Sequence, residues 1–194
     1  MEEEIKKIKE ESEKNNIPII MNDTLEVIKE ILLERTPKKI LEIGSGTGYS
    51  SICFANILSS EVKIDTIELD EFRAKEAIKN ISKVGLEAKI HVLIGDAVEL
   101  LADINGKYDI IFIDAAKSKY PIFLTHALRL TDKGSIIIAD NVLYKGYVLG
   151  DYNKHKQRTA VNHLREYLKN IEENPSLDTE ILDVGDGLAI SHIK

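Results

Sequence analysis

The sequence predicts an α/β fold with a doubly wound sheet of seven strands, mostly parallel and with an antiparallel C-terminal strand. Apolar runs of strand length alternate with segments of helical periodicity along most of the 194 residues, and this alternation is typical of parallel strands covered by helices on both faces. The last two apolar runs have no helix between them, so we expect them to form an antiparallel hairpin. No repeat, low-complexity segment or linker interrupts the pattern, and we expect one domain over residues 1–194.

The chain begins with a strongly charged helical segment. Over residues 1–14, Ile5 and Ile8 share one helical face and nearly all other positions are polar. A single thin apolar stripe cannot bury much surface. We therefore expect residues 1–16 to form a charged helical arm that is solvated or packs on a partner.

A second helix follows, and strands and helices then alternate. Asn22 or Asp23 is expected to cap a helix over 24–35, which Pro37 ends. The expected strands are 39–43, 62–69, 89–94, 109–113, 135–139, 179–184 and 188–192. The expected helices between them are 49–58, 71–84, 97–102, 119–130 and 156–173. Gly85 marks a helix end because glycine readily adopts the left-handed C-terminal conformation.

Composition narrows the class of protein. The net charge is -7 and the pI is about 5.3, which argues against a general polyanion binder. No apolar run approaches the ~18 residues of a membrane span, and the acidic N-terminus has no apolar signal core. Cys53 is the only cysteine, so an internal disulfide is excluded and a small buried hydrophobe is expected. We expect a cytoplasmic protein without a membrane partner.

A glycine loop follows the first expected strand and opens a helix. It runs Glu42-Ile-Gly44-Ser-Gly46-Thr-Gly48, and glycines at such a turn let the backbone approach a ligand closely. The dinucleotide fingerprint would require glycine at position 49, which is Tyr49. The loop therefore disfavours a dehydrogenase and favours a cofactor without phosphates, whose amino group an acid such as Glu42 can hold. A tight turn without a ligand is the alternative.

Two further acids end the next two strands. Glu68 can accept both ribose hydroxyls of a nucleoside, or it can be a solvated strand-end acid. Asp96 and Ala97 can flank an adenine edge. Asp96 also suits the N-cap of the following helix, and the two roles can coexist.

A third group of polar side chains follows the strands over 109–113 and 135–139. If these strands are parallel neighbours, Asp114, Asp140 and Asn141 meet at one edge of the sheet. Such hard oxygen donors suit magnesium or manganese, whereas a lone acid of this kind would more simply cap a helix. Lys117 either is a solvated loop lysine or serves as a general base, because a neighbouring divalent cation disfavours its charged form.

These motifs resemble two nested groups of enzymes. The Glu-x-Gly-x-Gly-x-Gly loop and Glu68 resemble class I S-adenosylmethionine-dependent methyltransferases, whose Rossmann-like seven-stranded sheet also ends in a reversed hairpin. The runs Phe-Ile-Asp-Ala-Ala-Lys-Ser-Lys-Tyr over 112–120 and Ala-Asp-Asn-Val-Leu over 139–143 resemble the metal-dependent O-methyltransferases of the catechol and caffeoyl-CoA type. The resemblance extends from Ile17 to the C-terminus. The tail over 174–191 is similar to a bacterial branch that includes the tRNA 5-hydroxyuridine methyltransferase.

The resemblance implies a cofactor, a metal and roles for individual residues. The cofactor is S-adenosylmethionine, and the metal is Mg²⁺ or Mn²⁺ held by Asp114, Asp140 and Asn141. Lys117 is the implied catalytic base. The implied cofactor contacts are Met21, Glu42, Gly44, Gly46, Ser50, Glu68, Asp96, Ala97 and Asp114. We also expect a homodimer.

The expected reaction is magnesium-dependent methylation of the 5-hydroxyl of wobble 5-hydroxyuridine in the tRNA anticodon loop, which gives 5-methoxyuridine. Residues 144–158 are rich in basic and aromatic side chains that suit phosphates and an unpaired base, namely Tyr144, Lys145, Tyr147, Tyr152, Lys154, Lys156 and Arg158. A solvated loop is the alternative there. Two other functions stay open: a small-molecule catechol-type O-methyltransferase, and a non-catalytic module that binds S-adenosylmethionine or RNA.

Overall fold

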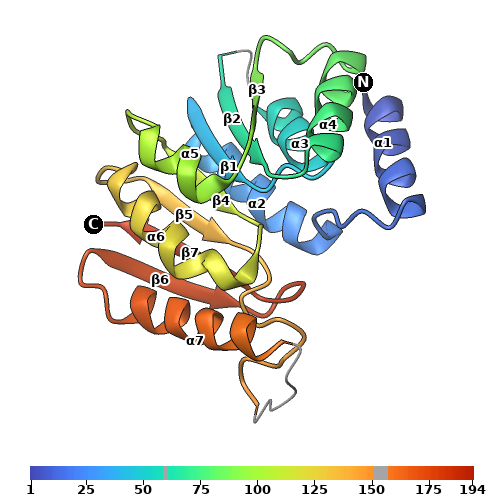
Figure 1. Cartoon of the computed structure of the whole chain (residues 1–194). Coiled ribbons are helices and arrows are strands. Elements are labelled where there is room, and N and C mark those ends of the chain that lie inside the picture. The colour runs from blue at the N-terminus through green and yellow to red at the C-terminus, as the bar shows by residue number, and fades with distance from the viewer. Residues whose placement is uncertain (59–60, 151–156) are drawn as a thin grey trace. The chain divides into compact units, whose positions relative to one another are not determined.

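The computed structural model describes residues 1–58, 61–150 and 157–194 (Figure 1). Its strands form one seven-stranded sheet in the order β3-β2-β1-β4-β5-β7-β6. Their bounds are β1 Lys39–Ile43, β2 Lys63–Glu68, β3 Ile90–Ile94, β4 Ile110–Ile113, β5 Ile136–Ala139, β6 Leu177–Leu182 and β7 Leu188–Ile193. β2 is parallel to β1 and β3, β4 is parallel to β5, and β7 is antiparallel to both β5 and β6. The predicted Rossmann-like fold class and its closing hairpin are confirmed.

The helices follow the expected order. Their bounds are α1 Glu2–Lys14, α2 Asn22–Arg35, α3 Tyr49–Ile57, α4 Glu71–Lys83, α5 Ala97–Asp103, α6 Tyr120–Arg129 and α7 Arg158–Glu172, with a short 3₁₀ turn, η1, at Lys117–Lys119. The predicted cap of α2 is wrong, because Met21 occupies the N-cap position and the helix already includes Asn22. The Asp23 carboxylate instead accepts a 2.8 Å hydrogen bond from the N–H of Thr24.

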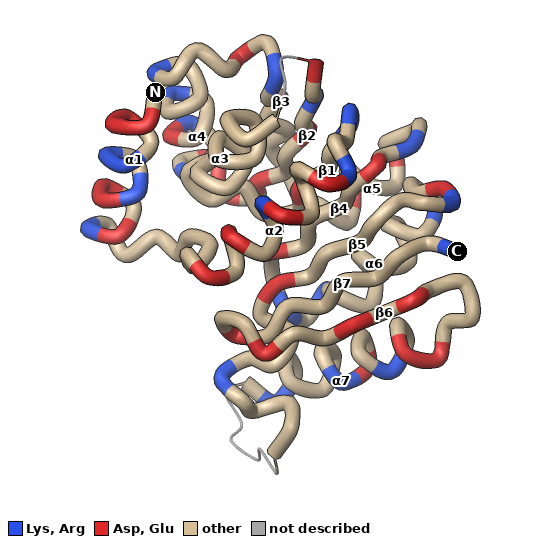
Figure 2. Tube along the Cα trace, turned by 180° about the vertical axis from the view of Figure 1, so that it is seen from behind, with Lys and Arg blue, Asp and Glu red and all other residues tan. Residues whose placement is uncertain are grey.

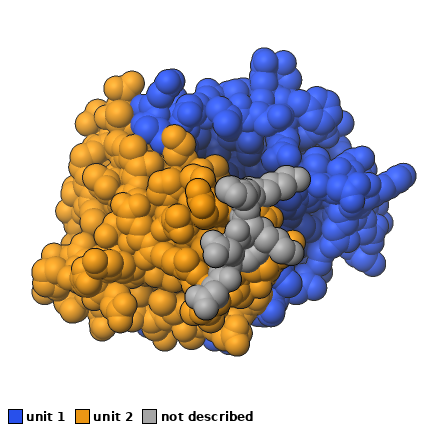
Figure 3. All heavy atoms as spheres, turned by 60° about the horizontal axis from the view of Figure 1, so that its bottom comes forward, with its two compact units in different colours: residues 1–100 blue, residues 101–194 orange. Residues whose placement is uncertain are grey.

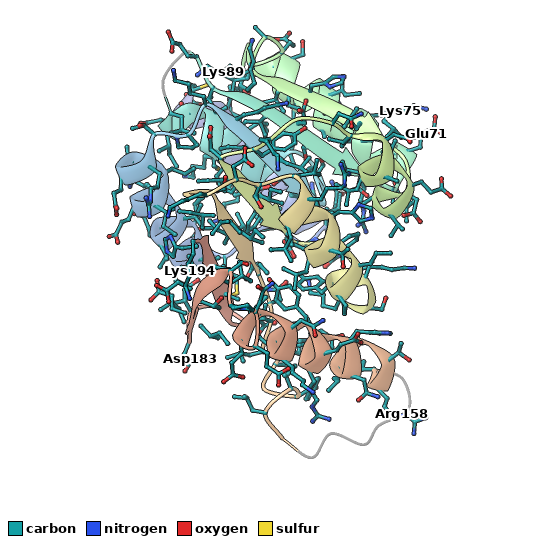
Figure 4. All side chains as sticks on the ribbon, turned by 90° about the vertical axis from the view of Figure 1, so that its left-hand side faces the viewer. Glu71, Lys75, Lys89, Arg158, Asp183 and Lys194 are labelled. Atoms are coloured by element: carbon teal, nitrogen blue, oxygen red, sulfur yellow. The ribbon has the colours of Figure 1, made fainter. Side chains whose placement is uncertain are left out.

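Strand β6 begins and ends two residues earlier than predicted. It pairs with β7 from Leu177, opposite Ile193, to Leu182, opposite Leu188. Asp183 already lies beyond the strand (Figure 4). The antiparallel register therefore sets these bounds, because the buried Leu177 finds its partner at the far end of β7.

The chain divides into two compact units, residues 1–100 and 101–194 (Figure 3). In the first unit, α3 packs on β2 and also contacts α1, α2 and α4. Both faces of β1 are buried over residues 40–43. Helix α4 keeps an exposed face on which Glu71 and Lys75 form an ion pair at 2.9 Å (Figure 4). The expectation that residues 1–194 act as one domain stays a prediction.

Helix α1 packs on its own chain along its apolar stripe, and packing of its other faces on a partner stays a prediction. Ile8 is only 1% exposed, and the helix lies against α3 of its own chain. Its outer face alternates in charge (Figure 2), with Lys7 2.7 Å from Glu4 and 3.3 Å from Glu3. The apolar stripe is thin, but it suffices because one side of the helix has a surface of its own chain to pack on.

The second unit is built on β4, β5, β7 and β6. Helix α7 packs on β6, on α6 and on η1, and the buried rings of Tyr120 and Tyr167 meet edge-on with centroids 5.5 Å apart. Such aromatic contacts stabilise a core beyond the area they bury. Across the described parts of both units, no helix is long and apolar enough to cross a membrane.

Candidate functional site

The glycine loop joins β1 to α3 and lies tightly against α4. The N–H groups of Gly44 and Ser45 both donate to the Ile67 carbonyl of β2, at 2.9 and 3.1 Å. Gly48 has a φ of +80°, and a Cβ atom there would lie 3.2 Å from the Cβ of Ala77. Only glycine combines this backbone conformation with so close an approach. The predicted strand–loop–helix placement of the loop is therefore confirmed.

Glu42 is buried beneath this loop and accepts three hydroxyl hydrogen bonds. The donors are Ser50 and Ser51, from the first turn of α3, and Thr66 at 2.5 Å. Thr66 lies directly opposite Glu42 in the β1–β2 register. Glu42 has no exposed surface. Its predicted contact with the amino group of the cofactor therefore stays a prediction. Ser51 and Thr66 are not among the residues that the sequence predicts for the site. The signal for them is a set of hydroxyl residues at positions facing a buried acid.

Glu68 is tied to the same loop. One of its carboxylate oxygens accepts a 2.8 Å hydrogen bond from the N–H of Gly46. The other accepts a 2.9 Å hydrogen bond from the backbone N–H of Asp70. The Asp96 carboxylate accepts a 2.7 Å hydrogen bond from the N–H of Val98, which confirms its capping role at α5. The structure thus brings Glu68 to the glycine loop, and Ala97 opens α5.

Met21 is placed by the start of α2, where its carbonyl accepts a 2.9 Å hydrogen bond from the N–H of Leu25. It precedes α2 and is 49% exposed. Its contact with a cofactor stays a prediction.

In the second unit, Asp114 and Asp140 follow neighbouring strands. β4 and β5 are parallel, with Ile113 opposite Ala139, so the two acids are the next residues in register, as predicted. The ammonium of Lys117, on η1, donates to a carboxylate oxygen of Asp114 at 3.1 Å and to the side-chain oxygen of Asn141 at 2.8 Å. The structure therefore brings all four predicted residues of this unit together.

Asp140 has the most perturbed electrostatics of the four. Its carboxylate is buried and accepts a 2.7 Å hydrogen bond from the N–H of Asn141. Burial raises the pKa of Asp140 to about 7, and the nearby charge of Asp114 adds to this rise. Asn141 holds its amide toward Lys117 with a left-handed backbone, φ +57°. A positive charge in front of these groups would stabilise the ionised form of Asp140.

The residues of this cluster suit a small hard cation. Two carboxylates and an amide oxygen are the oxygen ligands that Mg²⁺ and Mn²⁺ prefer. The Lys117 ammonium, bonded to two of the three, marks a position where positive charge is already favourable. Within residues 1–58, 61–150 and 157–194, no group of three or more His, Cys, Asp or Glu side chains forms an alternative metal site.

Tyr120 supports this cluster, although the sequence does not predict it as a site residue. Its buried hydroxyl donates to the backbone carbonyl of Asp140 at 2.7 Å, and it lies 3.3 Å from that of Ile113. Burial raises the pKa of Tyr120, so the phenol remains a donor. The available signal is its place at the end of the run over 112–120, three residues after Lys117.

The segment after Asn141 is described only in part. The rings of Tyr144 and Tyr147 meet edge-on, with centroids 5.8 Å apart. Lys145 is exposed, and Arg158 is the first residue of α7 (Figure 4). The remaining members of the predicted basic and aromatic set lie outside the described residues: Tyr152, Lys154 and Lys156.

Comparisons with known proteins identify the family of the chain. The profile of a family described as O-methyltransferase matches residues 2–193. The chain is 36% identical to the catechol O-methyltransferase of Niastella koreensis, over 81% of this chain and 74% of that protein. It is 32% identical to the caffeoyl-CoA O-methyltransferase of Stellaria longipes, over 78% and 66%. The crystal structure of an O-methyltransferase from Bacillus cereus in complex with SAH superposes with a TM-score of 0.89 at 27% identity, covering 99% of this chain and 91% of that one.

Proposed function

The chain belongs to the S-adenosylmethionine-dependent O-methyltransferase family of the catechol and caffeoyl-CoA enzymes, and we propose that it methylates a small acceptor with two adjacent oxygens in a metal-dependent reaction. The catechol O-methyltransferase of Niastella koreensis supports this class of acceptor. In such a molecule one hydroxyl receives the methyl group while its neighbour helps to hold the substrate in place.

The observation that carries the proposal is the bridge from Lys117 to Asp114 and Asn141, next to the buried Asp140. Asp114, Asp140 and Asn141 would hold a divalent cation, which would supply the positive charge that favours ionisation of the acceptor hydroxyl. A neutral Lys117 amine would take the proton of the acceptor hydroxyl, because it lies beside Asp114 and Asn141.

The first unit is proposed to hold the methyl donor. S-adenosylmethionine carries the methyl group on a positively charged sulfonium sulfur. This sulfur leaves as a neutral thioether, so the leaving group needs no further activation. Glu68 would accept the ribose hydroxyls, and Asp96 with Ala97 would border the adenine. The glycine loop, with Gly44, Gly46 and Ser50, would border the rest of the cofactor.

Methyl transfer from labelled S-adenosylmethionine to catechol or caffeoyl-CoA tests the proposal. We expect activity with Mg²⁺ or Mn²⁺, loss of at least a hundredfold after chelation, and recovery when the metal is restored. Asp140→Asn should lose activity and metal affinity, measured by calorimetry, whereas Asp178→Asn on β6 should retain both. Full activity in excess chelator, or in Asp140→Asn, would contradict metal dependence.

A second acceptor is the 5-hydroxyuridine of tRNA. The tail over 174–191 favours it, as do the basic and aromatic residues that follow Asn141. The base carries its 5-hydroxyl beside the 4-carbonyl, so the same metal site would suit both acceptors. Nucleoside mass spectrometry of hydroxyuridine-containing tRNA after incubation with the protein and S-adenosylmethionine distinguishes the two acceptors. Formation of 5-methoxyuridine without turnover of catechol would favour the tRNA acceptor over the small molecule. Cofactor binding without methylation of either acceptor would favour a non-catalytic module.

A further inference from the structure

Thr47, in the middle of the glycine loop, is held from two helices. Its hydroxyl lies 2.8 Å from the hydroxyl of Ser12 on α1. Its backbone carbonyl accepts a 3.1 Å hydrogen bond from the side-chain amide of Asn80 on α4. All three residues are buried. The two helices are also joined by an ion pair between Lys83 and Glu11 at 3.6 Å.

The direction of the hydroxyl hydrogen bond follows from counting protons. Ser12 donates its single hydroxyl proton to the Ile8 carbonyl, one turn earlier in α1, at 2.8 Å. It therefore has only lone pairs to offer Thr47, and Thr47 must be the donor. This fixes the Thr47 side chain, so removal of either hydroxyl changes how the loop is anchored.

We infer that α1 is a positioning element for the cofactor loop and that Ser12 and Thr47 are positioning residues for S-adenosylmethionine. The inference rests on the proposed cofactor site at the glycine loop. Thr47 separates Gly46, whose N–H donates to Glu68 at 2.8 Å, from Gly48, which packs on α4. A shift of Thr47 therefore moves the Gly46 N–H that orients the carboxylate proposed to bind ribose.

The loop needs such an anchor because of its glycines. Gly44, Gly46 and Gly48 all have positive φ, at 106°, 53° and 80°. Glycine loses more backbone freedom than any other residue when a conformation is fixed. A loop held in place before the cofactor binds avoids that cost during binding, which tightens affinity without touching the chemical step.

The test measures cofactor affinity directly. Thr47→Val keeps the shape of the side chain and removes the hydroxyl, and Ser12→Ala removes its partner. We expect each to weaken binding of S-adenosylmethionine about fivefold by calorimetry, the ratio expected for one neutral hydrogen bond. The double variant should be little weaker than Thr47→Val alone. Turnover at saturating cofactor should be unchanged, and Thr47→Ser should restore affinity.

A matched pair of hydroxyls on the other unit is the control. Thr179 on β6 donates to Ser191 on β7 at the same distance, 2.8 Å. Thr179→Val and Ser191→Ala remove an equivalent hydrogen bond, so we expect unchanged cofactor affinity. Circular dichroism establishes whether each variant is folded. If Thr47→Val does not fold, Ser12→Ala alone tests the inference.

Two outcomes distinguish failure of the inference from failure of the site. If Glu68→Ala abolishes binding while Thr47→Val and Ser12→Ala bind within twofold of the parent, only the positioning role is overturned. If Glu68→Ala binds normally, the proposed cofactor site itself is wrong. Additive losses in the double variant would also overturn the inference, because the two hydroxyls would then act separately.

Discussion

Two buried tyrosines in the second unit differ in the hydrogen bonds that their hydroxyl groups make. Tyr120 donates to the Asp140 carbonyl. The Tyr167 hydroxyl has no hydrogen-bond partner among the residues that the structure describes. Both rings are fully buried and touch each other. Their phenylalanine variants therefore compare the same chemical change in nearly the same surroundings.

We predict that Tyr120→Phe destabilises the protein by about 1–3 kcal/mol, because it leaves a buried carbonyl without its donor. Tyr167→Phe should be neutral or stabilising, since it removes an unsatisfied buried hydroxyl. Urea unfolding of the two variants provides the comparison. Equal losses would mean that the Tyr120 hydrogen bonds contribute nothing specific.

Gly187 is a second position where a single atom is expected to change the stability of the fold. It has a φ of +90°, and an added Cβ would lie 2.3 Å from the Cγ of Leu143. Gly134 has nearly the same φ, +91°, with nothing within 4 Å of such a Cβ. We predict that Gly134→Ala costs about 1–2 kcal/mol for its backbone conformation. Gly187→Ala should cost about 1–3 kcal/mol more for overpacking. Unfolding curves check the difference, and equal costs would show that Leu143 moves aside freely.

At the scale of elements, α7 fixes part of the segment that follows Asp140 and Asn141. The Arg165 guanidinium donates to the carbonyls of Val148 at 3.0 Å, Tyr147 at 3.4 Å and Gly150 at 2.5 Å. A planar group with several fixed donors can hold a loop backbone in one shape. On the proposed function, this segment follows the residues that would hold the metal, so we expect it to border the acceptor.

We predict that Arg165→Gln speeds amide hydrogen exchange at 147–150 and raises KM for the acceptor severalfold without changing cofactor affinity. Arg129 is the matched control, since it donates in the same way to the carbonyls of Leu101 and Ile104. Arg129→Gln should leave acceptor KM unchanged. A loss confined to cofactor affinity in Arg165→Gln would contradict the role assigned to the segment.

At the scale of the whole molecule, ligand binding is linked to stability. A cofactor present at a hundred times its Kd should stabilise the folded protein by about 2.7 kcal/mol, equivalent to roughly 5–10 °C in Tm for a chain of this size. Thermal unfolding with and without S-adenosylmethionine measures the shift. We expect Glu68→Ala to lose it and Glu180→Ala, an exposed acid on β6, to keep it.

The oligomeric state is a separate prediction at this scale. The expected homodimer is tested by sedimentation velocity at micromolar concentration, where it should sediment at twice the monomer mass of 21.8 kDa. A single monomeric species would contradict it.

The sequence by itself determined the strand–helix alternation, the closing hairpin, the glycine loop and the pair of acids after β4 and β5. These features depend on periodicity and on residues adjacent in the chain, which local physics controls. It left open whether Lys117 is a solvated loop lysine or a base, and only the structure shows its ammonium 3.1 Å from Asp114.

Only the tertiary structure decided what residues far apart in the chain do to one another. It packed the Ile8 side of α1 on its own chain, where a thin apolar stripe alone predicted a solvated or partner-packed arm. It gave Glu42 its donor Thr66 and gave Asp140 the hydroxyl of Tyr120. It also joined Ser12 to Thr47 across 35 positions. Such contacts depend on how elements pack, and no local pattern records which hydroxyl will face which buried acceptor.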